Sequence, residues 1–244
     1  MKRLHTHSQH FLRSPALVKE LFGHSSIKSH ETVIDIGAGS GVISAVLAQR
    51  VAKVIAVEVE PRTVEILKRN TNKFPNVTVY DKDFLSMPLP KEPYSIFANI
   101  PFHLSSPIIE RLIFTDQPPT KAYLIVQRQF AKKLVSDKPE TFTSQLGMLL
   151  GARYEFKIRK PLRKTDFWPH PAVDTVFLEI KLRQTPLVAP EKFSAYQRMT
   201  QECFSDPKKY LALPLDSQGL ADTPPSRTTI DKWVALFEAQ DRYR

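Results

Sequence analysis

Between residues 33 and 135 the chain alternates short apolar runs with segments of helical periodicity. The apolar runs predict strands at 33–36, 53–58, 76–80, 94–98 and 121–126, and the segments between and after them predict helices at 42–50, 61–73, 107–114 and around 130–135. Strands and helices that alternate at this spacing are typical of a parallel, doubly wound α/β sheet. No apolar run approaches the roughly 18–20 residues needed to cross a bilayer, so we expect no membrane partner.

The rhythm changes after residue 140. A helix is predicted at 142–150, two strands at 153–159 and 175–182, and two further helices at 191–204 and 228–241. The segment 167–174 between the two strands is too rich in proline for either regular form, and strands joined in this way should pair antiparallel at one sheet edge. Pro186 and Pro190 mark a boundary, and we predict domains at residues 1–183 and 184–244, the second of them small and all-helical.

The formal net charge of +10 is unevenly distributed, since residues 121–183 carry thirteen basic and six acidic side chains. A concentrated basic surface favours binding of a polyanion such as a nucleic acid, because each phosphate that is neutralised releases counterions. A basic protein without a nucleic-acid partner is the alternative. Cys203 is the only cysteine, which excludes an internal disulfide and fits a cytoplasmic protein. His5, His7 and His10 have no matching ligands nearby, so no metal is expected.

A glycine-rich turn, Asp35-Ile-Gly37-Ala-Gly39-Ser-Gly41, joins the first predicted strand to the following helix. Glycines let the backbone turn tightly and let a ligand approach main-chain N–H groups. The spacing differs from the dinucleotide fingerprint and from a Walker loop, and a simple tight turn is the alternative. Glu58 ends the next strand, where a carboxylate can accept hydrogen bonds from a ribose diol. Together these residues indicate an adenosine-containing ligand.

Asp83 follows the third strand and is the next acidic residue expected at the crevice. Its carboxylate suits an adenine amino group, and Phe84 beside it offers an apolar wall. The alternative is an ordinary turn-forming aspartate.

The segment Asn99-Ile100-Pro101-Phe102 directly follows the fourth strand. The proline stiffens the loop and fixes the Asn99 side chain and the Ile100 carbonyl relative to the ligand pocket. The lone pair of an aromatic exocyclic amine is delocalised into its ring, and two acceptors on the N–H protons would free it to attack a methyl sulfonium. Phe102 offers a face on which an extruded base can stack, and most of the catalytic help would be orientation. The alternative is a loop with a capping Asn and a core Phe.

The chain resembles the ribosomal RNA adenine N6-methyltransferase family. The matching elements occur in the family's order and are Ser8-Gln-His-Phe-Leu12, Asp35-Ile-Gly-Ala-Gly39, Glu58, Asp83, Asn99-Ile-Pro-Phe102 and Phe167-Trp-Pro-His-Pro-Ala-Val-Asp174. The resemblance implies a Rossmann-like, doubly wound, mostly parallel seven-stranded sheet with a small all-helical C-terminal domain, acting as a monomer on ribosomal RNA with S-adenosylmethionine.

The resemblance also implies roles for particular residues. The cofactor would be bound by Gln9, His10, Leu12, Gly37, Gly39, Glu58, Val59, Asp83, Phe84 and Asn99, and the catalytic group would be Asn99, Ile100, Pro101 and Phe102. From the basic charge of residues 121–183, independently of the resemblance, we expect RNA to be bound by Lys132, Lys133, Arg163 and Lys164. Within the cofactor set, Gly37 would lie against the methionine part, Glu58 on the ribose and Asp83 on the adenine amine. His10 stands where the family usually has Asn.

Within the family we favour the erythromycin-resistance branch, because Asn-Ile-Pro-Phe looks closer to it than the Asn-Leu-Pro-Tyr of the small-subunit enzymes and the C-terminal region is short. The implied target is an adenine of 23S rRNA whose methylation blocks macrolides, lincosamides and streptogramin B. Three alternatives remain: a 16S rRNA dimethyltransferase of ribosome assembly, a non-catalytic nucleic-acid-binding relative, and a DNA adenine methyltransferase, which Ile100 disfavours.

Overall fold

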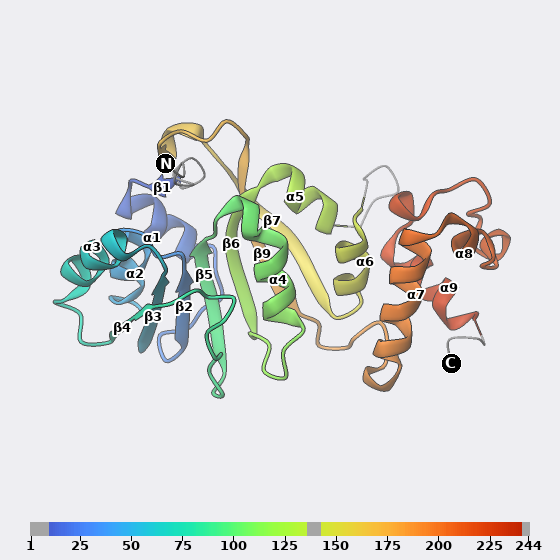
Figure 1. Cartoon of the computed structure of the whole chain (residues 1–244), viewed down its shortest axis with the longest axis horizontal. Helices are drawn as coiled ribbons and strands as arrows, with labels where there is room; N and C mark the ends of the chain where they lie inside the picture. The colour runs from blue at the N-terminus through green and yellow to red at the C-terminus, as the bar shows by residue number, and fades with distance from the viewer. Residues whose placement is uncertain (1–9, 136–142, 241–244) are drawn as a thin grey trace, which may run out of the picture. The chain divides into compact units, whose positions relative to one another are not determined.

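The computed structural model describes residues 10–135 and 143–240, which form two compact units (Figure 1). The first unit contains the chain up to Arg128 together with residues 158–180. The second contains residues 129–157 and the chain from Lys181 onward. The predicted domain boundary between residues 183 and 184 stays a prediction. Within the described residues, no helix is both long and apolar enough to cross a membrane.

The main sheet has seven strands in the order β4-β3-β2-β5-β6-β9-β7 (Figure 1). The strands are β2 (Thr32–Ile36), β3 (Lys53–Glu58), β4 (Val77–Asp81), β5 (Tyr94–Asn99), β6 (Lys121–Gln127), β7 (Tyr154–Leu162) and β9 (Thr175–Leu182). Strands β2 to β6 pair in parallel. The α/β class and the seven-stranded, mostly parallel sheet predicted from the sequence are therefore confirmed, and β9 and β7 are neighbours at one edge, where they were expected.

Helices alternate with these strands. They are α1 (Pro15–Gly23), α2 (Val42–Leu47), α3 (Pro61–Thr71), α4 (Ser105–Ile113) and α5 (Arg128–Leu134). Helix α3 begins where predicted, because Pro61 suits the first helical position and the Glu60 carboxylate accepts from Thr63 N at 2.7 Å. Helix α1 was not predicted, although Ser14 caps it and Pro15 opens it in the same way.

A second, two-stranded sheet was also missed. Strand β1 (Phe11–Leu12) pairs antiparallel with β8 (Phe167–Trp168), so that Phe11 lies opposite Trp168. The prediction that residues 167–174 contain no regular structure is wrong at its first two positions. Phe167 and Trp168 precede the prolines and keep the main-chain N–H groups that a strand needs. This small sheet fixes the polypeptide just before α1.

The second unit is built mainly from α6 (Gln145–Gly151), α7 (Phe193–Ser205), α8 (Pro207–Leu211) and α9 (Ile230–Glu238). Trp233 is fully buried in its core, stacks on Tyr210 with ring centroids 5.9 Å apart, and donates to Thr200 Oγ1 at 3.0 Å. Helices α6, α7 and α9 lie within the predicted ranges 142–150, 191–204 and 228–241 to within one residue. The short α8 was not predicted, and the helical C-terminal part of the fold is confirmed.

Candidate active site

The carboxyl ends of β2, β3 and β5 meet at one edge of the sheet, where the strand order reverses between β2 and β5. Such a switch point is the usual ligand-binding position in an open α/β sheet. The turn after β2 takes positive φ at Gly37 (66°), Gly39 (57°) and Gly41 (88°), which only glycine adopts without strain. The predicted glycine turn therefore lies beside the ends of β3 and β5.

A pocket opens at this edge, with about 710 Å³ of empty space including its mouth. Its lining comes from the first unit: His10, Phe11, Ile36, Gly37, Val57, Glu58, Val59, Lys82, Asp83, Phe84, Leu85, Asn99, Ile100, Pro101, Phe102, Leu104 and Ile108. The pocket thus brings together most of the predicted cofactor and catalytic residues.

Glu58 is the carboxylate at the end of β3 and is only 4 % exposed. Its Oε2 accepts from Gly39 N at 2.9 Å, and its Oε1 accepts from Val59 N at 2.9 Å and Glu60 N at 3.0 Å. These bonds fix the carboxylate and tie the glycine turn to the neighbouring strand. The two N–H groups occupy both lone pairs of Oε1, whereas Oε2 keeps one for a hydroxyl group in the pocket.

Asn99 ends β5 at the floor of the pocket. Its Nδ2 donates to the main-chain carbonyl of His10 at 2.6 Å, and its Oδ1 is buried with no hydrogen-bond partner among the described residues. The reversed amide would place two oxygens against each other, so the bond to His10 fixes the orientation. A buried acceptor without a partner is costly in a folded protein. Asn99 Oδ1 is therefore an acceptor oriented for a donor that no described residue supplies.

The glycine turn and the Asn-Ile-Pro-Phe loop are in direct contact. A Cβ added at Gly37 would lie 3.3 Å from Pro101 Cδ and 3.9 Å from the Asn99 carbonyl oxygen. Pro101 thus limits the space above Gly37. Asn99 therefore lies next to the glycine turn, as the hypothesis from the sequence requires.

Asp83 and Phe84 form a separate part of the lining. Asp83 Oδ1 accepts from Leu85 N at 2.9 Å, so this residue shapes its own turn, as the alternative interpretation expected, and it also lines the pocket. Phe84 is buried, and the Arg111 guanidinium lies over its ring at 5.9 Å from the centroid. One side of the pocket therefore offers a carboxylate beside an apolar wall.

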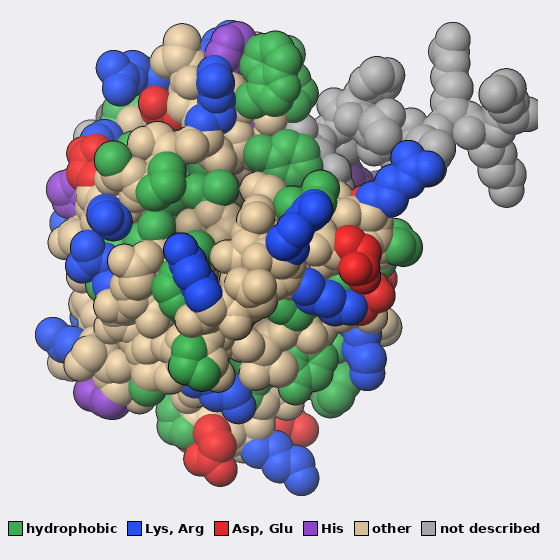
Figure 2. Space-filling view, turned by 90° about the vertical axis from the view of Figure 1, so that its left-hand side faces the viewer, with side chains coloured by type: hydrophobic (Ala, Val, Ile, Leu, Met, Phe, Trp, Pro, Cys, Tyr) green, Lys and Arg blue, Asp and Glu red, His purple; other side chains and the backbone are tan. Residues whose placement is uncertain are grey.

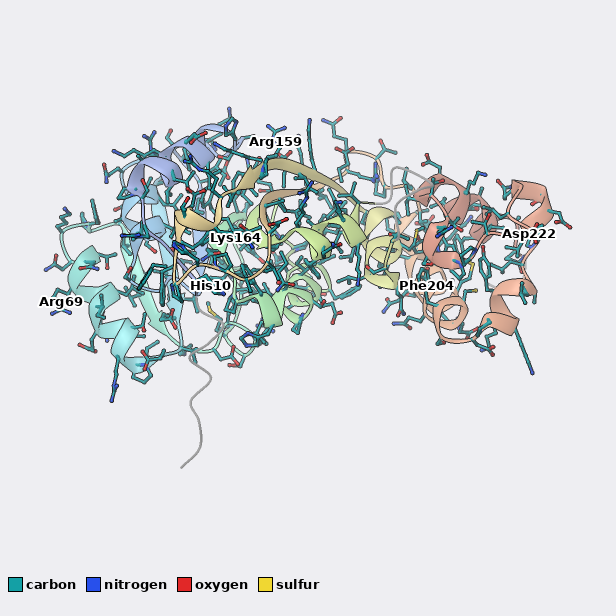
Figure 3. All side chains as sticks on the ribbon, turned by 90° about the horizontal axis from the view of Figure 1, so that it is seen from above. His10, Arg69, Arg159, Lys164, Phe204 and Asp222 are labelled. Carbon is teal, nitrogen blue, oxygen red and sulfur yellow. The ribbon has the colours of Figure 1, made fainter. Side chains whose placement is uncertain are left out.

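Aromatic rings surround the mouth. His10 is labelled in Figure 3. Its ring centroid lies 5.5 Å from that of Phe102, and its Nδ1 lies 2.8 Å from the Pro169 carbonyl oxygen. Phe11 packs against the glycine turn so closely that a Cβ at Gly39 would lie 2.8 Å from its ring. The β1–β8 sheet thus holds two rings at the pocket.

Asp35 is fully buried below the glycine turn. Its Oδ2 accepts from Ser44 Oγ at 2.6 Å, and its Oδ1 has no partner within the part of the chain that the structure describes. Burial raises the pKa of Asp35 to about 7, and the Glu58 carboxylate contributes in the same direction, although the Ser44 hydrogen bond opposes them. This residue was not predicted to belong to the site.

The remaining predicted residues lie elsewhere. Gln9 lies outside the described residues. Leu12 is buried in the hydrophobic core of the first unit and, like Gly39, is not in the pocket lining. Lys132 and Lys133 are exposed on α5 in the second unit, whereas Arg163 and Lys164 are exposed in the first. The four basic residues therefore belong to two different units.

Several lining residues were not predicted from the sequence. Ile36 and Val57 are the last apolar residues before Gly37 and Glu58, so their position at the strand ends could have predicted that they line the pocket. Phe11 lies inside the quoted Ser8–Leu12 motif but was given no role. Leu104 and Ile108 belong to the segment after Pro101 and carry no local signal for a ligand.

The lining of the pocket suits the chemical groups of S-adenosylmethionine. It combines the oriented acceptor of Asn99, a fixed carboxylate at Glu58 and glycines where a Cβ would meet Pro101 or Phe11. In the described residues, no group of three or more potential metal-ligating side chains is close enough to hold an ion. The sheet order and this pocket define a Rossmann-like methyltransferase that uses S-adenosylmethionine.

Comparison with known proteins shows to which methyltransferase family the chain is similar. The family model described as ribosomal RNA adenine dimethylase matches residues 2–230. A protein of Limosilactobacillus reuteri named rRNA adenine N-6-methyltransferase is 30 % identical over 198 residues, covering 81 % of this chain and 76 % of that protein. The ribosomal RNA small subunit methyltransferase A of Latilactobacillus sakei subsp. sakei (strain 23K) is 26 % identical over 219 residues, covering 86 % and 74 %.

Two solved structures share the fold. The 23S rRNA methyltransferase ErmE has a TM-score of 0.81 at 24 % identity, covering 95 % of this chain and 99 % of that one. A dimethyladenosine transferase from Plasmodium falciparum has a TM-score of 0.79 at 20 % identity, covering 96 % and 98 %. The chain belongs to the ribosomal RNA adenine dimethylase family and is an rRNA (adenine-N6)-methyltransferase.

Proposed function

We propose that this enzyme methylates N6 of one adenine in 23S rRNA and thereby confers resistance to macrolides, lincosamides and streptogramin B. The observation that carries the adenine chemistry is Asn99, whose amide is fixed by His10 and whose Oδ1 faces no donor among the described residues. The exocyclic amino group of adenine has two N–H donors, and Asn99 Oδ1 would accept a hydrogen bond from one of them.

The cofactor would occupy the pocket along the ends of β2, β3 and β5. Glu58 Oε2 would accept a hydrogen bond from a ribose hydroxyl, and Asp83 would accept one from the adenine amine beside Phe84. Gly37, Val59 and His10 would supply the rest of the contact surface. S-adenosylmethionine, when bound, supplies an electrophilic methyl group on a sulfonium.

The residues of the Asn-Ile-Pro-Phe loop would orient the target base. Asn99 Oδ1 and the Ile100 carbonyl would accept from its amino group, which localises the nitrogen lone pair. Phe102 would stack on the base, with the His10 ring beside it. Orientation of this kind would account for most of the expected rate enhancement. The methylated nitrogen is strongly acidic, so it would release its proton to water without a side-chain general base.

For the RNA itself, Lys132, Lys133, Arg163 and Lys164 would contact phosphates. All four are exposed, and the net charge of +10 favours a polyanion. We further propose that the enzyme acts as a monomer in the cytoplasm.

The choice of 23S rRNA rests on the Asn99-Ile-Pro-Phe102 motif, and a 16S rRNA adenine dimethyltransferase is the second candidate. The 16S candidate is favoured by relatives that are named small-subunit methyltransferases and whose alignments cover most of this chain. The 23S proposal is compatible with the fold shared with the 23S rRNA methyltransferase ErmE.

The test is a transfer assay with methyl-labelled S-adenosylmethionine and separated 16S and 23S rRNA from an untreated bacterium. Label should enter 23S rRNA, and nucleoside analysis should return N6-methylated adenosine at one position. A host expressing the enzyme should tolerate erythromycin, whereas the Asn99→Ala variant should not protect it. Label confined to 16S rRNA would replace the 23S proposal with the second candidate.

A further inference from the structure

The first unit carries a groove next to the cofactor pocket that the proposed reaction does not use. The groove encloses about 1090 Å³ including its open side and is lined by the β1–β8 sheet and the beginnings of α2 and α3. Phe11 lines both this groove and the cofactor pocket, so the two are adjacent. Whatever occupies the groove lies beside the reacting centre.

Trp168 is the largest side chain of the groove and is 62 % exposed. Tryptophan is highly buried on average, so an indole this exposed beside a ligand pocket offers a free aromatic face. Its position is fixed, because β8 pairs with β1 and places Trp168 directly opposite Phe11. Side chains opposite each other in an antiparallel pair lie on one face of the ladder. Trp168 and Phe11 therefore lie on the same face of the β1–β8 sheet, and Phe11 also lines the cofactor pocket.

The surroundings of Trp168 are basic. The Arg13 guanidinium lies 5.9 Å from the centre of the Trp168 ring, and the His170 ring meets it edge-on at 6.0 Å. The Arg163 side chain, five residues before Trp168, is 85 % exposed, and its Nε forms an ion pair with Asp166 Oδ1 at 3.7 Å. The described lining of the groove contains Arg13 and no acidic residue. Hydrophobic and Lys or Arg side chains are interspersed on the face drawn in Figure 2.

We propose that Trp168 and Arg13 form a stacking platform that holds an unpaired base of the substrate RNA next to the target adenine. The proposal rests on the proposed function, since it assumes that an adenine enters the adjacent pocket. When the target adenine is extruded, the next base of the RNA loses its stacking partner. An exposed indole replaces this stacking, and Arg13 adds a cation for the adjoining phosphate. Ser40, Thr63 and Ile66 form the opposite wall of the groove.

The protein contains only two tryptophans, which makes a direct test feasible. Trp233 is buried in the second unit, so quenching of tryptophan emission by RNA reports on Trp168. The probe is an unstructured RNA oligonucleotide containing one adenine, titrated into the full-length protein. Emission should fall on binding in the native protein, and the residual emission of Trp168→Phe should not change.

Affinity for the same oligonucleotide, measured by fluorescence anisotropy of a labelled end, distinguishes stacking from packing. Trp168→Ala should weaken binding by about fivefold to a hundredfold, because it removes one base–aromatic stack. Trp168→Phe should retain most of the affinity, and Trp168→Leu should not. Leu211→Ala, which removes a 65 % exposed apolar side chain from the second unit, should bind as the native protein does.

Failure of this inference is separable from failure of the proposed function. The affinity of Trp168→Ala for S-adenosylmethionine, measured by calorimetry, should stay within twofold of the native value. Unchanged RNA affinity in Trp168→Ala, or quenching that persists in Trp168→Phe, would overturn the platform even if the enzyme methylates 23S rRNA. Trp168-dependent binding and quenching would support it even if 16S rRNA proves to be the methyl acceptor.

Discussion

The side-chain amide of Asn99 donates to the main-chain carbonyl of His10 at 2.6 Å, joining two residues 89 positions apart in the chain. This bond orients the Asn99 amide and at the same time secures the segment that leads into β1. Two features of the site, the oriented acceptor and the aromatic rim, therefore depend on one hydrogen bond.

Replacing Asn99 with alanine should abolish methyl transfer, because it removes the oriented acceptor, while RNA affinity changes by less than about threefold. Asn99→Asp is the sharper variant. Its carboxylate presents an oxygen to the His10 carbonyl in place of the N–H donor, so we expect it to weaken cofactor binding as well. Single-turnover rates with labelled cofactor and 23S rRNA, with cofactor affinity measured by calorimetry, separate the two effects. A fully active Asn99→Ala enzyme would refute the proposed role.

The glycine turn allows a prediction with an internal control. Gly39→Ala forces a Cβ within 2.8 Å of the Phe11 ring and into a backbone conformation with φ of 57°. We expect a loss of stability of about 1–3 kcal/mol and weaker cofactor binding.

Gly23→Ala is the matched control, since a Cβ there meets nothing within 4 Å and the residue lies at the end of α1. Alanine should leave stability unchanged or raise it by about 0.5–1 kcal/mol. Urea denaturation of both variants provides the measurement. Equal effects at the two positions would mean that the contact between Phe11 and the turn is unimportant.

The sequence predicted the parts of this fold that depend on local patterns. Strands β3 and β9 have the predicted bounds, because each is an apolar run between turn residues. Glu58 and Asn99 were correctly expected at one edge, since parallel strands present their carboxyl ends together.

What escaped prediction depends on contacts between distant segments. The β1–β8 pairing has two residues on each side, too few for a periodic pattern, and it accompanies a hydrogen bond between His10 and Pro169 that lie 159 positions apart. The role of Phe11 and the exposure of Trp168 follow from that pairing. Asp35 was quoted as part of the turn, but its complete burial depends on neighbouring strands on both sides.

The basic residues of α5 should contribute to RNA affinity by binding phosphates. Substituting Lys132 and Lys133 together with alanine should weaken binding and reduce the slope of log affinity against log salt by about 0.7–0.9 for each phosphate that is no longer neutralised. The charge-preserving pair Lys132→Arg and Lys133→Arg should retain the native slope. Binding to rRNA fragments at several salt concentrations gives the slopes, and an unaltered slope in the alanine variant would place the RNA surface elsewhere.

The buried carboxyl of Asp35 predicts a pH dependence of stability. Its pKa is about 7 in the folded protein against an ordinary value of 3.8, because burial disfavours the charge. The folded state therefore keeps a proton that the unfolded chain has already released between these pH values. Stability from this group is fully present below about pH 4 and is lost as pH rises toward 7, by about 1.4 kcal/mol for each unit.

Asp35→Asn tests this directly, because asparagine keeps an acceptor for Ser44 and cannot ionise. Between pH 5 and pH 7 the native protein should lose on the order of 2–3 kcal/mol relative to the variant. Urea denaturation at a series of pH values measures the difference. Parallel curves for the two proteins would show that Asp35 is ionised throughout, and that the folded structure supplies the carboxylate with a donor beyond Ser44.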